Sequence, residues 1–227
     1  MIIEKHTYDN GLAIALWDIA ETEEQLMELL DNDAVVAEEI VPFTSTKRRL
    51  EYLASRCALN ELTGAGQHIC YHENGAPYLA SNPLNISISH TGHYALVATH
   101  PTDKVGIDIE RIGDKVGRVR HKFLSKAELE SIDTRSEKIH LTILWAAKEA
   151  MYKVMGIETV EFTEQIAIEP FTPYMEGEII AHETASAEKK TYKLQYKVYP
   201  EFVIVHTIKD TKRFPQIIAY IRPNIRE

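Results

Sequence analysis

The sequence predicts an α+β protein, in which helices and mostly antiparallel sheets form two lobes of similar composition. Segments with a helical spacing of apolar residues alternate with short strand-like segments, and the chain after residue 160 is rich in strands. No linker or low-complexity segment separates the two halves. We therefore expect an N-terminal lobe of residues 1–104 that packs with a C-terminal lobe of residues 105–227.

The composition and charge are those of a folded globular protein. Of the 227 residues, 44% are hydrophobic and 26% are charged, and the formal net charge is −9. This balance argues against a broad nucleic-acid-binding surface but allows a local basic pocket for a phosphorylated ligand. Cys57 and Cys70 lack metal-binding spacing, so we expect buried thiols in a reducing compartment. Neither a signal-peptide pattern nor a membrane-spanning run is found, which predicts a cytoplasmic protein without a membrane partner.

The N-terminal half is expected to begin with a strand and two helices. Residues 1–20 alternate enough to predict a strand. Residues 22–31 begin with Thr22 and have Gln25 three positions later, a capping-box pattern that predicts a short helix. Residues 45–62 have apolar residues at helical spacing and several basic residues in the first turns, which predicts a longer helix with a basic face.

Turn signals and periodicity predict the remaining elements. Asn74-Gly75 predicts a hairpin between two short strands, and the segment LNISISHTGHYALVATH reads as two strands that meet at Thr91-Gly92. Residues 125–137 and 139–155 are expected to be helical. Five strands are expected in the remaining chain: EQIAIEP (164–170), GEIIAHE (177–183), YKLQYKVY (192–199), EFVIVHTI (201–208) and IIAYI (217–221).

The segment VGIDIE, residues 105–110, alternates aliphatic residues with Asp108 and Glu110. Because side chains alternate faces along a strand, both carboxylates are expected on the same face, opposite the aliphatic residues. This pattern has two explanations. The face is exposed to solvent, or the two carboxylates share a hard divalent cation, which prefers oxygen ligands.

The helix that begins near His140 has two distinct faces. Four apolar residues at helical spacing are expected to face the core: Leu144, Ala147, Met151 and Val154. Trp145, Glu149 and Lys153 follow one another at i+4 on a different face. The Glu149–Lys153 pair is either a surface ion pair or part of a site.

VGIDIE, followed further along the chain by W-x-x-K-E-x-x-x-K, resembles the paired signature of the 4′-phosphopantetheinyl transferases. Four other segments resemble parts of this family in the expected order: KRRLEYLASR, ENGAPYL, SISHTGHYALVA and KFLSKAEL. The chain resembles the monomeric, two-lobed type that serves surfactin synthetase. The resemblance implies two pseudo-duplicated lobes with the active site at the lobe interface.

The family transfers the 4′-phosphopantetheine arm of coenzyme A to a serine of an apo acyl or peptidyl carrier protein and releases 3′,5′-ADP. Such holo-[acyl-carrier-protein] synthases act in fatty acid, polyketide and nonribosomal peptide biosynthesis. By this resemblance, Asp108, Glu110 and Glu149 bind a magnesium ion, or manganese in its place. Glu149, Lys153 and Asp108 are the expected catalytic residues: Glu149 accepts the serine proton, directly or through water, and Lys153 neutralises the leaving phosphate.

The resemblance also implies which residues bind coenzyme A. Arg48 and Arg56, two helical turns apart, are expected at the 3′-phosphate. Ser89 and His90 are expected at a phosphate, as is Lys153. Trp145 and Lys148 are expected to border the carrier protein or the pantetheine arm.

Ala76 stands where the family often has a basic residue before Pro77. Lys47 or Arg49 could supply the missing contact with the nucleotide.

Two alternatives stay open from the sequence. The three carboxylates could serve a magnesium-dependent phosphohydrolase that acts on coenzyme A or another nucleotide. The chain could also be a non-catalytic module that binds coenzyme A or a carrier protein.

Overall fold

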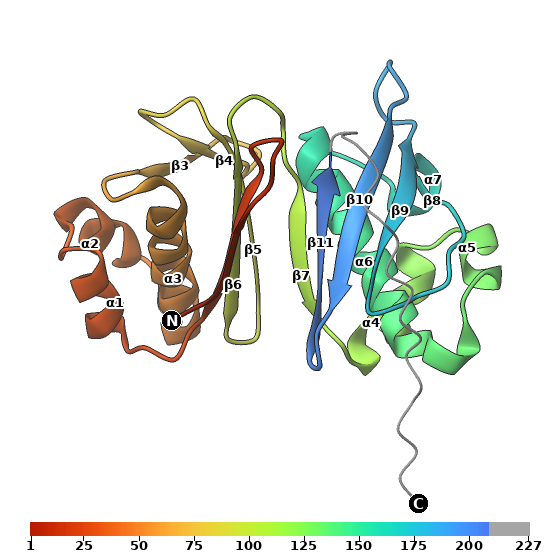
Figure 1. The fold of residues 1–227 in the computed structure, drawn as a ribbon, viewed down its shortest axis with the longest axis horizontal. Coiled ribbons are helices and arrows are strands. Elements are labelled where there is room, and N and C mark those ends of the chain that lie inside the picture. Colours follow the sequence, from red (N-terminus) through yellow and green to blue (C-terminus); the bar gives the residue numbers. More distant parts are fainter. Residues whose placement is uncertain (209–227) are drawn as a thin grey trace, which may run out of the picture. The chain divides into compact units, whose positions relative to one another are not determined.

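The computed structural model describes residues 1–208 and confirms the α+β class (Figure 1). The chain divides into two compact units, Met1–Ile107 and Asp108–Glu227, which we call unit 1 and unit 2. The boundary therefore lies inside the acidic strand, between Ile107 and Asp108, instead of between residues 104 and 105. The strand expected at residues 217–221 lies outside the described residues.

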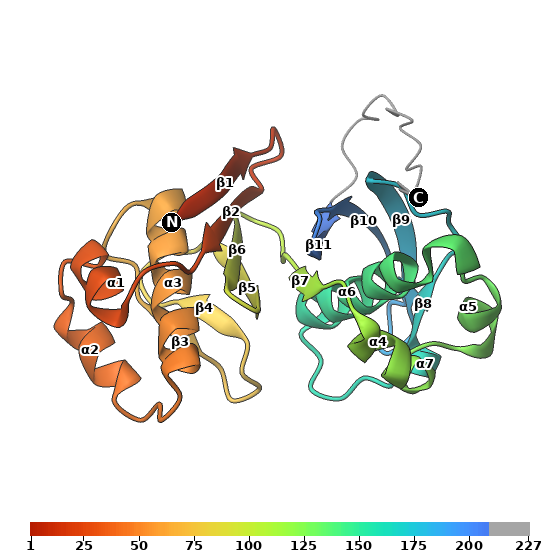
Figure 2. The same cartoon turned by 90° about the horizontal axis from the view of Figure 1, so that it is seen from below.

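Unit 1 contains a four-stranded antiparallel sheet covered by helices. The sheet order is β1-β2-β6-β5, and a separate two-stranded sheet pairs β3 with β4. The strands are β1 (Ile2–Thr7), β2 (Ala13–Asp18), β3 (Ile69–Tyr71), β4 (Pro77–Leu79), β5 (Asn85–Thr91) and β6 (Tyr94–His100). The helices are α1 (Glu23–Leu29), α2 (Ala34–Ile40) and α3 (Thr46–Thr63). Helix α3 packs on β2 and β6, and α1 and α2 pack on the other side of α3 (Figures 1 and 2).

Local signals explain the helices of unit 1. The predicted capping box at α1 is confirmed, with reciprocal hydrogen bonds between Thr22 and Gln25. Helix α3 begins after the N-cap Ser45 and ends at Gly64, whose φ of 82° suits glycine. Helix α2 was not predicted. Asp33 caps its first turn through two backbone N–H groups.

Unit 2 contains a five-stranded sheet in the order β7-β11-β10-β9-β8. Its strands are β7 (Ile107–Arg111), β8 (Ile166–Ile168), β9 (Glu176–Glu183), β10 (Thr191–Val198) and β11 (Phe202–Ile208). Its helices are α4 (Asp114–Val119), α5 (Lys126–Glu130), α6 (Glu137–Met155) and α7 (Phe162–Gln165), with 3₁₀ turns at Arg120–Lys122 and Thr134–Ser136. Helix α6 packs against β11, β10 and β8, and α4 packs against α6.

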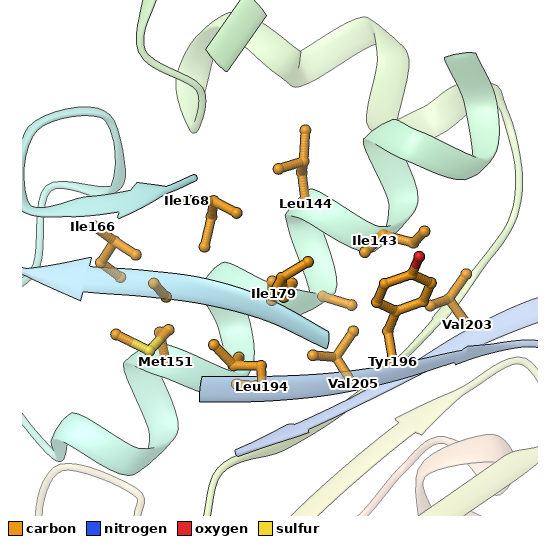
Figure 3. Packing of buried hydrophobic residues seen from close by; sticks show 14 of the residues in the cluster. Ile143, Leu144, Met151, Ile166, Ile168, Ile179, Leu194, Tyr196, Val203 and Val205 are labelled. Carbon is orange, nitrogen blue, oxygen red and sulfur yellow. The ribbon is translucent and has the colours of Figure 1, made fainter. Parts of the chain in front are cut away.

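The predicted core face of α6 is confirmed. All four predicted residues are at most 4% exposed: Leu144, Ala147, Met151 and Val154. They belong to a cluster with side chains from the sheet, among them Ile168, Ile179 and Leu194 (Figure 3). Burial of each large aliphatic side chain contributes about 1.5–3 kcal/mol. This face fixes the rotation of α6 and thereby directs Glu149 and Lys153 away from the cluster, while Trp145 packs against its edge.

Some predicted elements differ from the structure. Residues 125–137 form only the short helix α5 and a 3₁₀ turn, because Asp133 caps a new turn with its carboxylate. Residues 164–165 belong to α7, so the strand that follows is shorter than predicted. Within residues 1–208, no helix has the length and apolar character needed to cross a membrane.

Candidate functional site

The two acidic residues of β7 differ in their exposure to solvent. Asp108 is only 5% exposed, and Glu110 is half-buried. Asp108 Oδ1 lies 2.8 Å from Nζ of Lys153, which α6 carries on the face opposite its core residues. The explanation of this strand as a solvent-exposed acidic face is therefore wrong for Asp108. Strand β7 and helix α6 bring together Asp108 and Lys153, two of the predicted site residues.

Glu149 and Glu110 are close enough to Asp108 for their protonation to depend on it. Burial, together with the charges of Asp108 and Glu110 and against the opposing charge of Lys153, raises the pKa of Glu149 to about 7. Burial, and then the charge of Asp108, also raises the pKa of Glu110. Burial and the neighbouring carboxylate of Asp108 therefore both disfavour the charged forms of Glu149 and Glu110, which a bound cation would stabilise.

The carboxylates of Asp108, Glu110 and Glu149 are suitable ligands for a divalent metal, but they are not arranged around a common metal position in this structure. Three carboxylates offer the oxygen donors that magnesium prefers. Among residues 1–208, no three His, Cys, Asp or Glu side chains are arranged to hold a metal ion. In this arrangement Lys153 is the cation paired with Asp108.

Trp145 lies beside Glu110, one of the three carboxylates. Its ring is half-buried and packs edge-on against Phe123, with ring centroids 4.9 Å apart. A hydrogen bond from Trp145 to Glu110 lowers the pKa of that carboxyl and so opposes the effect of burial. Trp145 therefore links α6 to the acidic strand.

The expectation that Lys148 borders a partner is wrong. Its side chain is fully buried, with Nζ 2.8 Å from Glu128 Oε2 and within 2.8 Å of the carbonyl oxygens of Phe162 and Ile166. Glu128 also accepts hydrogen bonds from the backbone N–H groups of Ser125 and Ile168. Lys148 therefore holds α5, α6 and the α7–β8 segment together.

The two arginines of α3 have different surroundings. Arg48 is exposed and lies over the Phe43 ring, 5.7 Å from its centroid. Arg56 is 3% exposed, stacks on the Tyr52 ring and pairs with Glu39 at 3.3 Å. Their binding of a 3′-phosphate stays a prediction, since Arg56 is held by internal partners.

Ser89 and His90 are neighbours on β5 but differ in burial. Ser89 is 7% exposed, whereas the His90 side chain is 40% exposed. Nδ1 of His90 lies 3.6 Å from Oε1 of Glu51 on α3. The sequence analysis did not identify Glu51; its i+4 spacing from Lys47 was the only signal for it, and such pairs are common on helix surfaces.

Comparison with known proteins bears on unit 2. Residues 104–213 match the model of the 4′-phosphopantetheinyl transferase superfamily, while no curated protein matches the chain. The matched segment contains β7 and α6, and with them Asp108, Glu110, Glu149 and Lys153. The resemblance found from the sequence is thereby confirmed at the level of the superfamily. Residues 104–213, with the acidic strand and the Glu–Lys helix, belong to the 4′-phosphopantetheinyl transferase superfamily.

Proposed function

We propose that this protein transfers the 4′-phosphopantetheine arm of coenzyme A to a serine of an apo acyl or peptidyl carrier protein. Phosphopantetheine transfer in general follows from the superfamily. The observation that supports this reaction is the group of Asp108, Glu110, Glu149 and Lys153 on β7 and α6. We further expect a cytoplasmic monomer.

The proposed reaction is a displacement at phosphorus. The serine Oγ forms a bond to the phosphorus that carries the pantetheine arm, and the bond from this phosphorus to the bridging pyrophosphate oxygen breaks, so that oxygen leaves with the nucleotide. The products are the holo-carrier and 3′,5′-ADP, and the serine proton passes to a base. Such a displacement needs stabilisation of the negative charge that develops on the pyrophosphate.

Glu149 is the proposed base. Without a bound cation the pKa of this carboxyl is about 7; a cation beside it would lower the pKa and leave a carboxylate that can accept the serine proton. Lys153, one helical turn further along α6, is the proposed cation for the phosphate that leaves.

Asp108, Glu110 and Glu149 would hold the proposed magnesium, or manganese in its place. The ion would supply a Lewis acid that neutralises pyrophosphate oxygens. For Lys153 to act on the substrate, its ammonium group must exchange Asp108 for a phosphate oxygen.

Coenzyme A binding in unit 1 is proposed for Arg48, His90, Ser89 and Arg56. Arg48 and His90 are the more accessible of these side chains. Ser89 and Arg56 are buried in this structure, so they can contribute only through local rearrangement or through support of their neighbours.

A basic segment of unit 2 supports a carrier protein as the partner. Residues 111–126 contain six Lys or Arg residues and one acid, Asp114, an excess of five positive charges in a chain with a net charge of −9. All six side chains are exposed: Arg111, Lys115, Arg118, Arg120, Lys122 and Lys126. Since carrier proteins are acidic, this segment fits them by charge.

Incubation with coenzyme A, magnesium and a panel of apo-carriers, followed by intact-mass measurement, tests the proposal. The carrier should gain the mass of phosphopantetheine only when both coenzyme A and metal are present. Release of 3′,5′-ADP without any gain of carrier mass would favour the phosphohydrolase. Binding of coenzyme A without release of any product would favour a non-catalytic module.

A further inference from the structure

Glu51 is a buried acid inside the region of unit 1 proposed to bind phosphate. Its side chain is 9% exposed, and its Oε1 lies 3.4 Å from Nζ of Lys47 and 3.6 Å from Nδ1 of His90. Buried carboxylates are rare unless they are paired. A carboxylate beside phosphate ligands would also repel the substrate unless it acts through the neighbouring cations.

We propose that Lys47, Glu51 and His90 form one phosphate-binding group, in which Glu51 is the positioning residue and Lys47 supplies the cation that Ala76 does not. This inference rests on the proposed function. The three side chains come from α3 and from the end of β5, both in unit 1.

Glu51 can act on His90 through ring orientation and charge. Its carboxylate faces Nδ1, so the other ring nitrogen, Nε2, points away from Glu51. A carboxylate at this distance favours the doubly protonated imidazolium, whose Nε2–H can donate to a phosphate oxygen. Across the sheet, β6 places the uncharged Ala95 opposite His90. From α3, the charges that face the imidazole are Glu51 and, beyond it, Lys47.

The structure favours Lys47 over Arg49 as the replacement for the missing basic residue. Arg49 donates to Glu23 of α1, and its side chain is 32% exposed. Lys47 is 66% exposed, lies one helical turn before Glu51 and pairs with it at i,i+4. Such a pair is worth a few tenths of a kcal/mol, so a phosphate can displace it.

The Glu51→Gln substitution tests this group, because it removes the charge and keeps the shape. We expect the NMR titration of His90, recorded without coenzyme A, to move to lower pH. Calorimetry should show coenzyme A binding weakened about tenfold at slightly alkaline pH and less at acidic pH. In the transfer assay the loss should lie in KM for coenzyme A rather than in kcat. The control is Glu61→Gln, an exposed acid of α3 that pairs with Lys5.

A second variant keeps the inference testable if Glu51→Gln folds poorly. Lys47→Met changes an exposed residue and should also weaken coenzyme A binding, by about three- to tenfold. In the double variant Lys47→Met/Glu51→Gln, the loss of coenzyme A binding free energy should be smaller than the sum of the two single losses, because the residues act together.

The outcomes separate this inference from the proposed function. An unchanged His90 titration, or equal or tighter coenzyme A binding by Glu51→Gln, would overturn the inference even if transfer occurs. Failure of transfer with every carrier would reject the proposed function, whereas the titration and calorimetry need no carrier and would still decide the role of Glu51.

Discussion

Two lysines of α6 have the same contact distance but opposite surroundings. Lys148 and Lys153 each place Nζ 2.8 Å from a carboxylate oxygen, of Glu128 and Asp108 respectively. The Lys148 side chain is 0% exposed and also donates to two backbone carbonyls, whereas 25% of the Lys153 side chain is exposed. Near Lys153, burial and the charge of Asp108 raise the pKa of Glu149.

The difference shows that the contact distance alone does not separate a structural ion pair from a functional one. Around Lys148, the donors of the ammonium group and both oxygens of Glu128 are matched by partners, so the pair stabilises the fold and offers nothing to a ligand. Around Lys153, the ammonium group pairs with Asp108 and acts on Glu149, while the charge of Asp108 raises the pKa of both Glu149 and Glu110. Such an imbalance is characteristic of sites that bind an additional charge.

The largest effect is expected from Lys148→Met. This change leaves the Glu128 carboxylate buried without its cation and should lower the free energy of unfolding by about 3–5 kcal/mol, measured by urea denaturation. Lys153→Met is the matched control and should cost less, about 1–2 kcal/mol, because the Lys153 side chain is 25% exposed and water can replace it beside the buried Asp108. Addition of Glu128→Leu to Lys148→Met should recover much of the loss. Equal losses for the two single variants would remove the contrast between the pairs.

Asp108→Asn should separate activity from stability. The amide keeps the shape of the side chain but removes one of three ligand charges, so transfer should fall about a thousandfold, equivalent to about 4 kcal/mol. The free energy of unfolding without metal should change by less than about 1 kcal/mol, since the loss of the Lys153 pair is offset by weaker repulsion. Asp114→Asn, an exposed acid that pairs with Lys138, is the control and should retain activity. Near-normal transfer by Asp108→Asn at saturating magnesium would contradict a shared metal.

Much of unit 2's site could be predicted from the sequence because its signals are local. Strand alternation placed Asp108 and Glu110 on one face, and helical spacing placed Glu149 and Lys153 together on α6. The pairing of β7 with α6 could not be derived from spacing; it came from the resemblance.

The buried ion pair of Lys148 was missed for a physical reason. Lys148 lies four residues after Leu144 and three before Met151, a spacing that favours the core-facing side, but from the sequence we expected Lys148 to border a partner. A pattern does not show whether a distant residue neutralises a charge there, and Glu128 is 20 positions away. The same limit applies to Glu51, whose partner His90 lies on a strand that no local signal connects to α3.

Glu149→Gln should raise stability in a pH-dependent way when metal is removed by chelation. The pKa of Glu149 is about 7 in the folded protein, against an ordinary value of 4.5, so ionisation costs stability as the pH rises between these values. The shift corresponds to at most about 3 kcal/mol, and we expect a gain of about 2 kcal/mol at about pH 8 because the carboxyl is partly exposed. Near pH 5 the gain should largely disappear, because the carboxyl is then protonated in the folded state. Urea denaturation at both pH values measures the difference, and an equal gain at both would mean that charge is not its cause.

The smallest expected effect extends the same comparison to the two arginines of α3. Arg56→Ala removes a buried guanidinium that pairs with Glu39 and should lower the free energy of unfolding by about 1.5 kcal/mol. Arg48→Ala changes an exposed residue and should alter it by less than about 0.5 kcal/mol. If Arg48 binds the 3′-phosphate, its loss should weaken binding of coenzyme A but leave binding of dephospho-coenzyme A nearly unchanged, as calorimetry with both ligands can show. If Arg56→Ala instead keeps full stability and discriminates between the two ligands, then Arg56 binds the phosphate despite its burial, and accessibility is a poor guide to function on this helix.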